Sequence, residues 1–141
     1  MYRLETYANG LPEEARRIRL EVFCTEQGYS PAQEFDGDDA TALHAVVYDG
    51  PEAVATGRLI RDGGGIFHLG RIAVRKPWRG QAAGRFLMEE LMELARRQGA
   101  HTFRLGAQVQ ASGFYEKLGF HTAGEVYPDG HVPHVPMERQ A

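Results

Sequence analysis

Cysteine is almost absent from this sequence of 141 residues, which contains only Cys24. A single thiol excludes an internal disulfide and fits a reducing compartment. No apolar run approaches the roughly 18 residues that a membrane-spanning helix needs, and the N-terminal segment Met-Tyr-Arg-Leu-Glu lacks the apolar core of a secretion signal. These absences predict a cytoplasmic protein without a membrane partner.

Repeats, low-complexity tracts and linker-like segments are missing as well. The length suits one domain with a real core, so we expect a single domain over residues 1–141. The net charge of −3 at pH 7 argues against a nucleic-acid partner, because such proteins carry extensive positive charge.

Acidic residues are also missing from the stretch between Gly63 and Met88, although it contains five cations. These are Arg71, Arg75, Lys76, Arg79 and Arg85. The local excess of positive charge predicts a basic patch of a size that suits a small anionic ligand.

The same part of the chain, Leu69–Gln98, has the pattern of a strand, a tight loop and a helix. Pro77 ends the strand because proline cannot donate a hydrogen bond to a sheet. Apolar residues then recur with helical spacing at Leu87, Leu91, Leu94 and Ala95. The loop between them is nearly bare, with Gly80 and Gly84 around Ala82 and Ala83.

A bare loop before a helix suits phosphate binding, because the first N–H groups of a helix lack partners and small side chains let an anion approach them. The alternative is an ordinary strand–helix turn with a solvated basic rim. A P-loop is excluded because Gly84-Arg85-Phe86 replaces Gly-Lys-Ser/Thr, and the glycine spacing differs from the dinucleotide fingerprint.

The remaining pattern predicts an α/β fold of the α+β type. Hairpin signals at Asp49-Gly50 and Asp62–Gly65 indicate antiparallel pairs, and the strand–helix–strand unit around the long helix requires a parallel pair. We therefore expect a mixed, mostly antiparallel twisted sheet of about seven strands with a central parallel pair and flanking helices. The expected strands are Tyr2–Tyr7, Leu43–Tyr48, Val54–Ile60, the strand that ends at Val74, His101–Ala107, Phe120–Tyr127 and Val132–Met137.

Two segments resemble the signatures of the GNAT superfamily of acetyl-CoA-dependent N-acetyltransferases. Arg79–Gly84 is similar to its pyrophosphate loop, and Phe114–Phe120 is similar to its Tyr-x-x-x-Gly-Phe signature. Further segments resemble the small bacterial branch of ElaA-like and YjcF-like proteins. They are Arg19–Phe23, Glu26–Gly28, His44, Ala107-Gln108 and Val132–Met137.

The resemblance implies a GNAT-like fold and a site for acetyl-CoA as cosubstrate. Pantetheine would pair with the strand before the loop, and the loop would hold the pyrophosphate. The implied cofactor-binding residues are Ile72, Ala73, Val74, Arg79, Gly80, Gln81, Ala82, Ala83, Gly84, Arg85, Gln108, Phe114 and Lys117. Ala82 stands where the family has its first glycine, so it fits the loop at negative φ and is strained at positive φ.

Tyr115 is the expected general acid, because a phenol with a reference pKa of about 10 is protonated at neutral pH and can donate to a departing thiolate. Its alternative role is an aromatic that packs on the sheet. Lone histidines and carboxylates are often structural, but Glu34, Asp36, His44 and His134 are the candidate acceptor-binding residues and bases. The acidic run Glu34–Asp39 would attract a cationic acceptor, or would simply be a solvated loop.

No histidine pair has a convincing ligand spacing, so we expect no metal. Nothing near Cys24 in the sequence would activate it as a nucleophile. The expected function is acetyl transfer to a primary amine of a small molecule, protein or peptide, by direct attack in a ternary complex. A non-catalytic acyl-CoA-binding or sensing module, another acyl chain and an oxygen acceptor remain alternatives, and a homodimer remains open.

Overall fold

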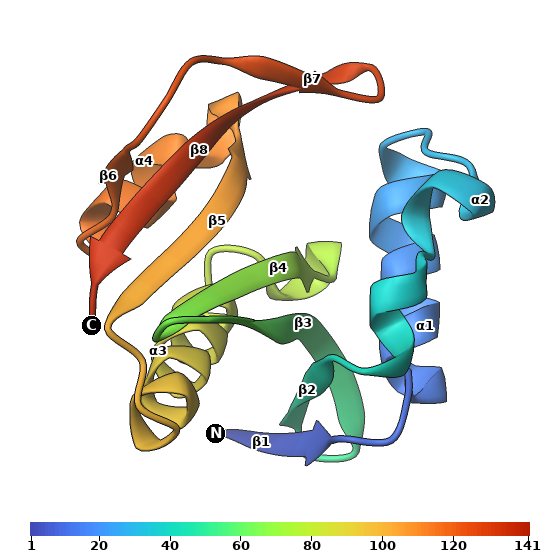
Figure 1. Ribbon diagram of the computed structural model, residues 1–141. Helices are drawn as coiled ribbons and strands as arrows, with labels where there is room; N and C mark the ends of the chain where they lie inside the picture. The colour runs from blue at the N-terminus through green and yellow to red at the C-terminus, as the bar shows by residue number, and fades with distance from the viewer.

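A mixed sheet of eight strands forms the centre of the computed structural model, which describes residues 1–141 (Figure 1). The strand order is β1-β2-β3-β4-β5-β8-β6, and β7 also pairs with β8. Every pair is antiparallel except β4–β5, which confirms the predicted sheet type. The strands are β1 (Tyr2–Tyr7), β2 (Leu43–Asp49), β3 (Glu52–Gly63), β4 (Ile66–Val74), β5 (Thr102–Gln108), β6 (His121–Thr122), β7 (Tyr127–Asp129) and β8 (Val132–Gln140).

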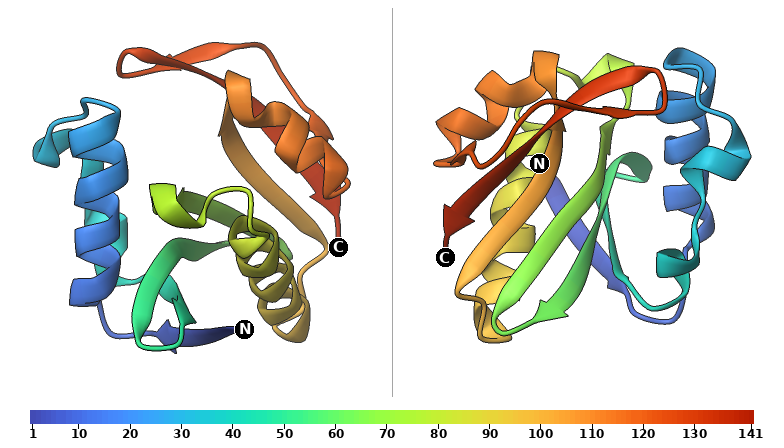
Figure 2. Two further views of the ribbon diagram at one scale, coloured as in Figure 1. Left: turned by 180° about the vertical axis from the view of Figure 1, so that it is seen from behind. Right: turned by 45° about the horizontal axis from the view of Figure 1, so that its top comes forward.

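Helices cover both faces of the sheet (Figures 1 and 2). The long helix α3 (Ala83–Arg97) and the short α4 (Ser112–Lys117) lie on one face, while α1 (Glu13–Arg19) lies on the other. The chain also contains a π-helix η1 (Leu20–Glu26), the short helix α2 (Pro31–Glu34) and three 3₁₀ turns, η2 (Gly37–Ala40), η3 (Lys76–Trp78) and η4 (Val109–Ala111). None of these helices has the length and apolar character to span a membrane.

The side chains of strand β4 point alternately to the two faces of the sheet, so this strand contributes to both layers of the core. Phe67 and Leu69 are buried among the apolar side chains of α3, including Leu87 and Leu91. Further along the strand, Ala73 joins a second cluster with Phe23 of η1. Because successive side chains of a strand point to opposite faces, His68 and Gly70, which alternate with Phe67 and Leu69, are turned toward the α1 side.

The parallel pair β4–β5 is short, and this shapes the middle of the molecule. Only Ile66–His68 pairs with Thr102–Arg104, whereas β5 continues alongside β8 as far as Gln108. The two strands therefore diverge, as Figure 1 shows. The edge of Leu69–Val74 that faces β5 is left without a strand partner.

A β-bulge interrupts β4 within this free segment. Thr56 of β3 lies opposite Ala73 and Arg58 lies opposite Gly70, so Arg71 and Ile72 share one position on the partner strand. Arg71 has φ +50°, a left-handed conformation that costs a non-glycine residue about 1–2 kcal/mol. Bulges of this kind redirect side chains and often occur beside functional sites.

Two elements differ from the sequence prediction. The predicted strand Phe120–Tyr127 is divided into β6 and β7, which raises the count from seven to eight. The physical reason is Pro136 on β8, which has no N–H to donate, and Gly124, where an added Cβ would lie 2.7 Å from Pro136 Cγ. Beyond α1 the chain continues directly into the π-helix η1 at Leu20, a rare form that apolar spacing does not reveal.

Candidate active site

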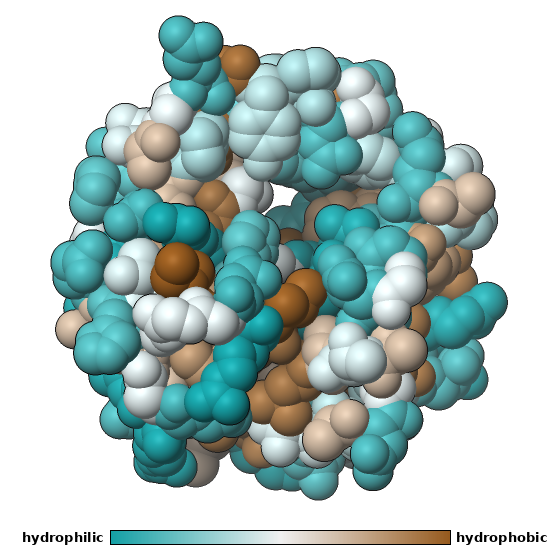
Figure 3. All heavy atoms as spheres, in the orientation of Figure 1, coloured by the Kyte–Doolittle hydropathy of each residue, from teal (hydrophilic) through white to brown (hydrophobic).

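A cavity of about 320 Å³ occupies the gap between the diverging ends of β4 and β5. This volume is within the usual range of small-molecule sites, roughly 300–1,000 Å³. Leu69–Val74 of β4 forms one wall, and Leu105, Gly106 and Gln108 of β5 form the opposite wall. In the space-filling view an opening is visible in this region, below the β7–β8 hairpin (Figure 3).

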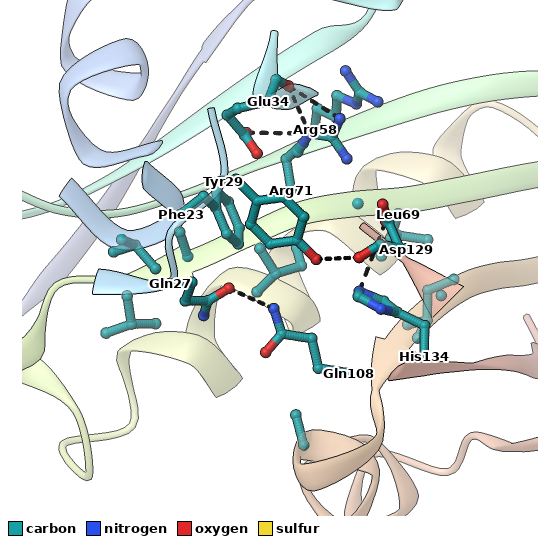
Figure 4. A pocket seen from close by; sticks show the side chains of 18 of the residues that line it. Phe23, Gln27, Tyr29, Glu34, Arg58, Leu69, Arg71, Gln108, Asp129 and His134 are labelled. Carbon is teal, nitrogen blue, oxygen red and sulfur yellow. Dashed lines mark hydrogen bonds and ion pairs between the residues drawn. The ribbon is translucent and has the colours of Figure 1, made fainter. Parts of the chain in front are cut away.

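The β7–β8 hairpin bridges the cavity by contacting the segment between η1 and α2. The Tyr29 hydroxyl donates to the carbonyl of Asp129 at 2.6 Å. The His131 ring lies 2.5 Å from the Gln27 carbonyl oxygen, and Gln108 Nε2 donates to Gln27 Oε1 at 2.6 Å. Residues far apart in sequence thus close around one site, as Figure 4 shows for Tyr29, Asp129, Gln27 and Gln108.

The free edge of β4 is suited to an extended ligand. Alternate backbone groups of a strand point to opposite edges, so part of the Leu69–Val74 backbone offers N–H and C=O groups toward the cavity. Such an edge can pair with a ligand as it would with another strand. Ile72, Ala73 and Val74, which we expected to bind pantetheine, all line the cavity.

Tyr115 lies at the cavity on the buried side of α4 and is 8% exposed. Its ring makes edge contacts with Phe114 and Phe120, at centroid distances of 5.0 and 6.2 Å. The hydroxyl has no hydrogen-bond partner in the protein and is not sealed from solvent. Burial raises the pKa of Tyr115 to about 12, so the phenol is protonated at neutral pH.

The loop expected to bind pyrophosphate begins at the cavity and leads away from it. Arg79 lines the cavity, donating from Nε to the Val74 carbonyl and from Nη2 to Glu26, whereas the segment 80–85 lies outside the lining. Ala82 has φ +66°. Of the two conformations considered for this position, it therefore adopts the left-handed one, which is strained for a residue with a side chain. Lys117 is exposed at the end of α4 and lies outside the cavity lining.

The two signature segments touch at Gly84, the second residue of α3. A Cβ built there would lie 3.3 Å from Phe114 Cζ and 3.4 Å from Val74 Cγ2. The absence of a side chain therefore lets the loop, the end of β4 and α4 pack closely together.

Replacing Gly84 with Val should weaken CoA binding at least tenfold, because its two methyl groups would displace Phe114 or the loop backbone. Calorimetric titration with CoA measures this, after circular dichroism shows that the variant is folded. Gly113→Val is the control, since a Cβ at Gly113 has no neighbour within 4 Å. An unchanged CoA affinity in the folded Gly84 variant would remove the loop from the binding site.

The predicted basic patch is largely neutralised by acids from other parts of the chain. Arg75 pairs with Glu21 and Glu52, Arg79 pairs with Glu26, and Arg85 pairs with Glu89. Arg71 points to α2 and is paired there as well. Among the five cations, only Lys76 makes no ion pair, so the sequence count overestimated the free positive charge.

Three carboxylates of the acidic run Glu34–Asp39 are held in ion pairs, whereas Asp38 is exposed and makes none. Glu34, which is 4% exposed, accepts from buried Arg19 at 2.7 Å and lies 3.1 Å from Arg71 Nε. Asp39 pairs with Arg19 and Arg58. Asp36 pairs with Arg58 and Arg71. Three arginines from α1, β3 and β4 thus compensate three carboxylates, a pairing that sequence distance concealed.

Two of the predicted acceptor residues lie outside the cavity lining. The hydrogen bond from Arg58 lowers the pKa of Asp36 to about 2, which makes this carboxylate a poor base. His44 is buried on β2, where its Nε2 is bonded to the Asp39 carbonyl at 2.9 Å. These positions and contacts give no support to the expected acceptor-binding role of Asp36 and His44.

Glu34 and His134 do line the cavity, at different walls. His134 is 7% exposed and its Nδ1 donates to the Val132 carbonyl at 2.9 Å, which leaves Nε2 as the basic nitrogen of the neutral ring. That Nε2 lies 3.8 Å from Asp129 Oδ2 (Figure 4). The sequence did not single out Tyr29, Arg58, His68, Tyr127 or Asp129 as cavity residues, because no local motif marks them.

No cluster of three potential ligands could hold a metal ion. Burial and the nearby Glu34 raise the pKa of the Cys24 thiol, which keeps it protonated and unreactive at neutral pH.

Comparison with known proteins supplies the family. Residues 9–141 match the model of the acetyltransferase (GNAT) domain. YjcF, an uncharacterized N-acetyltransferase of Bacillus subtilis, is 38% identical over 127 residues, which cover 89% of each protein. The crystal structure of Escherichia coli ElaA superimposes with a TM-score of 0.85 at 29% identity, covering 99% of both chains.

A further similarity concerns the fold alone. A Bacillus subtilis acetyltransferase crystallised with CoA superimposes with a TM-score of 0.75 at 16% identity, covering 100% of this chain and 99% of the other.

The match to the family model and the identity to YjcF show that the chain belongs to the GNAT acetyltransferases, in the branch that contains YjcF and ElaA, and is an acyl-CoA-dependent acyltransferase.

Proposed function

We propose that the protein transfers the acetyl group of acetyl-CoA to a primary amine by direct attack in a ternary complex. The observation that carries this proposal is the Tyr115 hydroxyl, which is protonated and has no protein partner. It faces the same cavity as the free edge of β4. A proton donor and unpaired backbone donors in one enclosed space are what thioester aminolysis requires.

The residues around the cavity fit acetyl-CoA. The free backbone of Ile72, Ala73 and Val74 would bind pantetheine and polarise the thioester carbonyl. The amide of Gln108 would give up its hydrogen bond to Gln27 and bind pantetheine instead. Phe114 would form a wall of the CoA site. The pyrophosphate would be held outside the cavity by the loop residues, Arg79, Gly80, Gln81, Ala82, Ala83, Gly84 and Arg85, with Lys117 near the phosphates.

The chemical step follows from these positions. The neutral amine attacks the carbonyl carbon, and the backbone N–H groups of β4 stabilise the negative charge on its oxygen. As the C–S bond breaks, Tyr115 donates its proton to the departing thiolate. The higher pKa of the phenol keeps its proton in place until the thiolate forms. Because a thiol has a reference pKa of about 8.5, this transfer is uphill by itself, so it is coupled to C–S cleavage, and Tyr115 regains a proton from solvent afterwards.

The test is thiol release from acetyl-CoA with three amines of different charge: spermidine, tyramine and aspartate. We expect thiol release that depends on the amine, and an N-acetyl product by mass spectrometry. The order of the rates with the three amines also tests which acceptor charge is preferred. Because Glu34, Asp36 and Asp39 are paired with arginines, they give no reason to expect that the polycation spermidine reacts fastest. CoA binding without turnover on any amine would contradict the proposal, and an ester product would identify an oxygen acceptor.

A further inference from the structure

His68 is a cavity-lining histidine that lies beside the predicted cofactor strand. It follows Phe67 and precedes Leu69 on β4, and both of these neighbours pack under α3. Its side chain is therefore on the opposite face of the strand, the face that it shares with Gly70. A Cβ built at Gly70 would lie 3.8 Å from His68 Nδ1, so the ring lies against the bare backbone just before the Arg71 bulge.

The ring of His68 has no hydrogen-bond partner in the protein. The other histidines near the site are bonded to backbone carbonyls: His44 to Asp39, His131 to Gln27 and His134 to Val132. Neither nitrogen of His68 is sealed from solvent, since Arg58 Nε is the only buried side-chain nitrogen or oxygen without a partner. Both nitrogens of His68 are thus available to a ligand in the cavity.

The surroundings keep His68 neutral at physiological pH. Burial lowers its pKa, Asp62 raises it, and Arg58, Arg104 and Arg71 lower it further, with a net decrease below the ordinary value. These charged groups come from β3, β4 and β5. A neutral imidazole with a free lone pair is a proton acceptor.

The other titratable groups of the cavity are less suited to that task. The Glu34 carboxylate is held between Arg19 and Arg71. The free Nε2 of His134 lies beside the Asp129 carboxylate, on the hairpin wall, whereas His68 projects from the strand whose backbone is expected to hold the thioester.

We infer that His68 is the general base that removes a proton from the acceptor ammonium group. This inference rests on the proposed amine acetylation. The acceptor R–NH₃⁺ gives one proton to a nitrogen of His68, and the resulting lone pair forms the new C–N bond. The C–S bond then breaks, Tyr115 protonates the sulfur, and the amide nitrogen loses its remaining excess proton to solvent. His68 releases the proton that it took and Tyr115 regains one from solvent, so that one proton is released per turnover.

His68→Gln tests this assignment, because glutamine retains a polar side chain but has no basic nitrogen. With tyramine and acetyl-CoA at pH 7 we expect kcat/KM for the amine to fall about 100-fold, at the lower end of what a general base contributes. The deficit should shrink as the pH approaches the pKa of the amine, since the variant depends on acceptor that is already neutral. CoA affinity by calorimetry should remain within about twofold.

Two further variants make the comparison specific. His121→Gln removes an exposed histidine of β6 that lies outside the cavity lining, and it should keep the pH profile of the parent. His134→Gln tests the competing base. A parent-like pH profile of the His68 variant, or a larger pH-dependent loss in the His134 variant, would overturn the inference while leaving amine acetylation intact.

A measurement without an acceptor separates the inference from the proposed function. In the free enzyme, the NMR titration of the His68 ring should give a pKa below the reference value of about 6.5, with assignment by the missing signal in His68→Gln. A ring that stays protonated above pH 8 would contradict the assignment as base. Absence of turnover by the parent enzyme on every amine would contradict the proposed function and with it the inference.

Discussion

Replacing Tyr115 with Phe should lower kcat by about 10²–10⁴-fold, which corresponds to about 3–5 kcal/mol of transition-state stabilisation. The substitution retains the ring and its edge contacts with Phe114 and Phe120, and removes only the proton that the leaving thiolate would receive. Because this interaction exists only in the transition state, kcat should fall while CoA affinity remains nearly unchanged. Steady-state kinetics and calorimetry on the same preparation measure both quantities.

With an acyl donor whose leaving group needs no protonation, the loss of kcat in the Tyr115→Phe variant should be smaller than with acetyl-CoA. Tyr48→Phe is a suitable control, since that buried hydroxyl interacts with Tyr7 at 3.1 Å, away from the cavity lining. Turnover of Tyr115→Phe within about threefold of the parent would mean that the proton comes from elsewhere, with solvent as the first alternative. Loss of CoA binding would instead make Tyr115 a wall of the cofactor site.

The second large effect is expected from Arg19→Met, which should lower the free energy of unfolding by about 3–5 kcal/mol. Arg19 is 1% exposed and donates to Glu34 Oε2, to the Glu34 carbonyl and to both oxygens of Asp39. Its removal leaves two carboxylates in the interior without their main partner. Arg58 and Arg71 compensate part of this loss, which favours the lower part of the range.

Urea unfolding of the Arg19 variant should be compared with Arg17→Met, two residues earlier on the same helix. The Arg17 side chain is 75% exposed and pairs with Glu13 at i,i+4, a contact whose loss costs less than about 0.5 kcal/mol. Equal stability of the two variants would contradict a stabilising role of the ion pairs of Arg19 with Glu34 and Asp39. In an Arg19→Met/Glu34→Gln double variant, a combined loss smaller than the sum of the single losses would show that the two residues act together.

The ion-pair cluster of Arg19, Arg58 and Arg71 with Glu34, Asp36 and Asp39 also contacts the strand that lines the cavity. Arg71, whose side chain reaches Glu34 and Asp36, occupies the left-handed position of the β4 bulge. The same ion-pair cluster therefore fixes α2 against β4 and holds the strand where it turns its backbone to the cavity. An acidic run that suggested acceptor binding in the sequence has a structural role in the folded chain.

The ion pairs of the Glu34–Asp39 run could not be predicted from the sequence, for a physical reason. Charge in a sequence is counted along the chain, whereas compensation depends on distance in space. Arg19 lies 15 residues from Glu34, and Arg58 lies 22 residues from Asp36. The same limitation produced a basic patch at Arg71–Arg85 whose partners are Asp36 and residues of η1, α2, β3 and α3.

The sequence by itself determined the mixed sheet type with its parallel pair, the long helix, the bare loop before it and the family, because these follow from local periodicity and from short motifs. The site depended on tertiary structure. Only the divergence of β4 from β5 opens a cavity, and only the contact of the β7–β8 hairpin with Tyr29 and Gln27 encloses it. His68 became a candidate base, and His44 and Asp36 lost that role, because a side chain's access and partners are set by long-range packing that no local pattern contains.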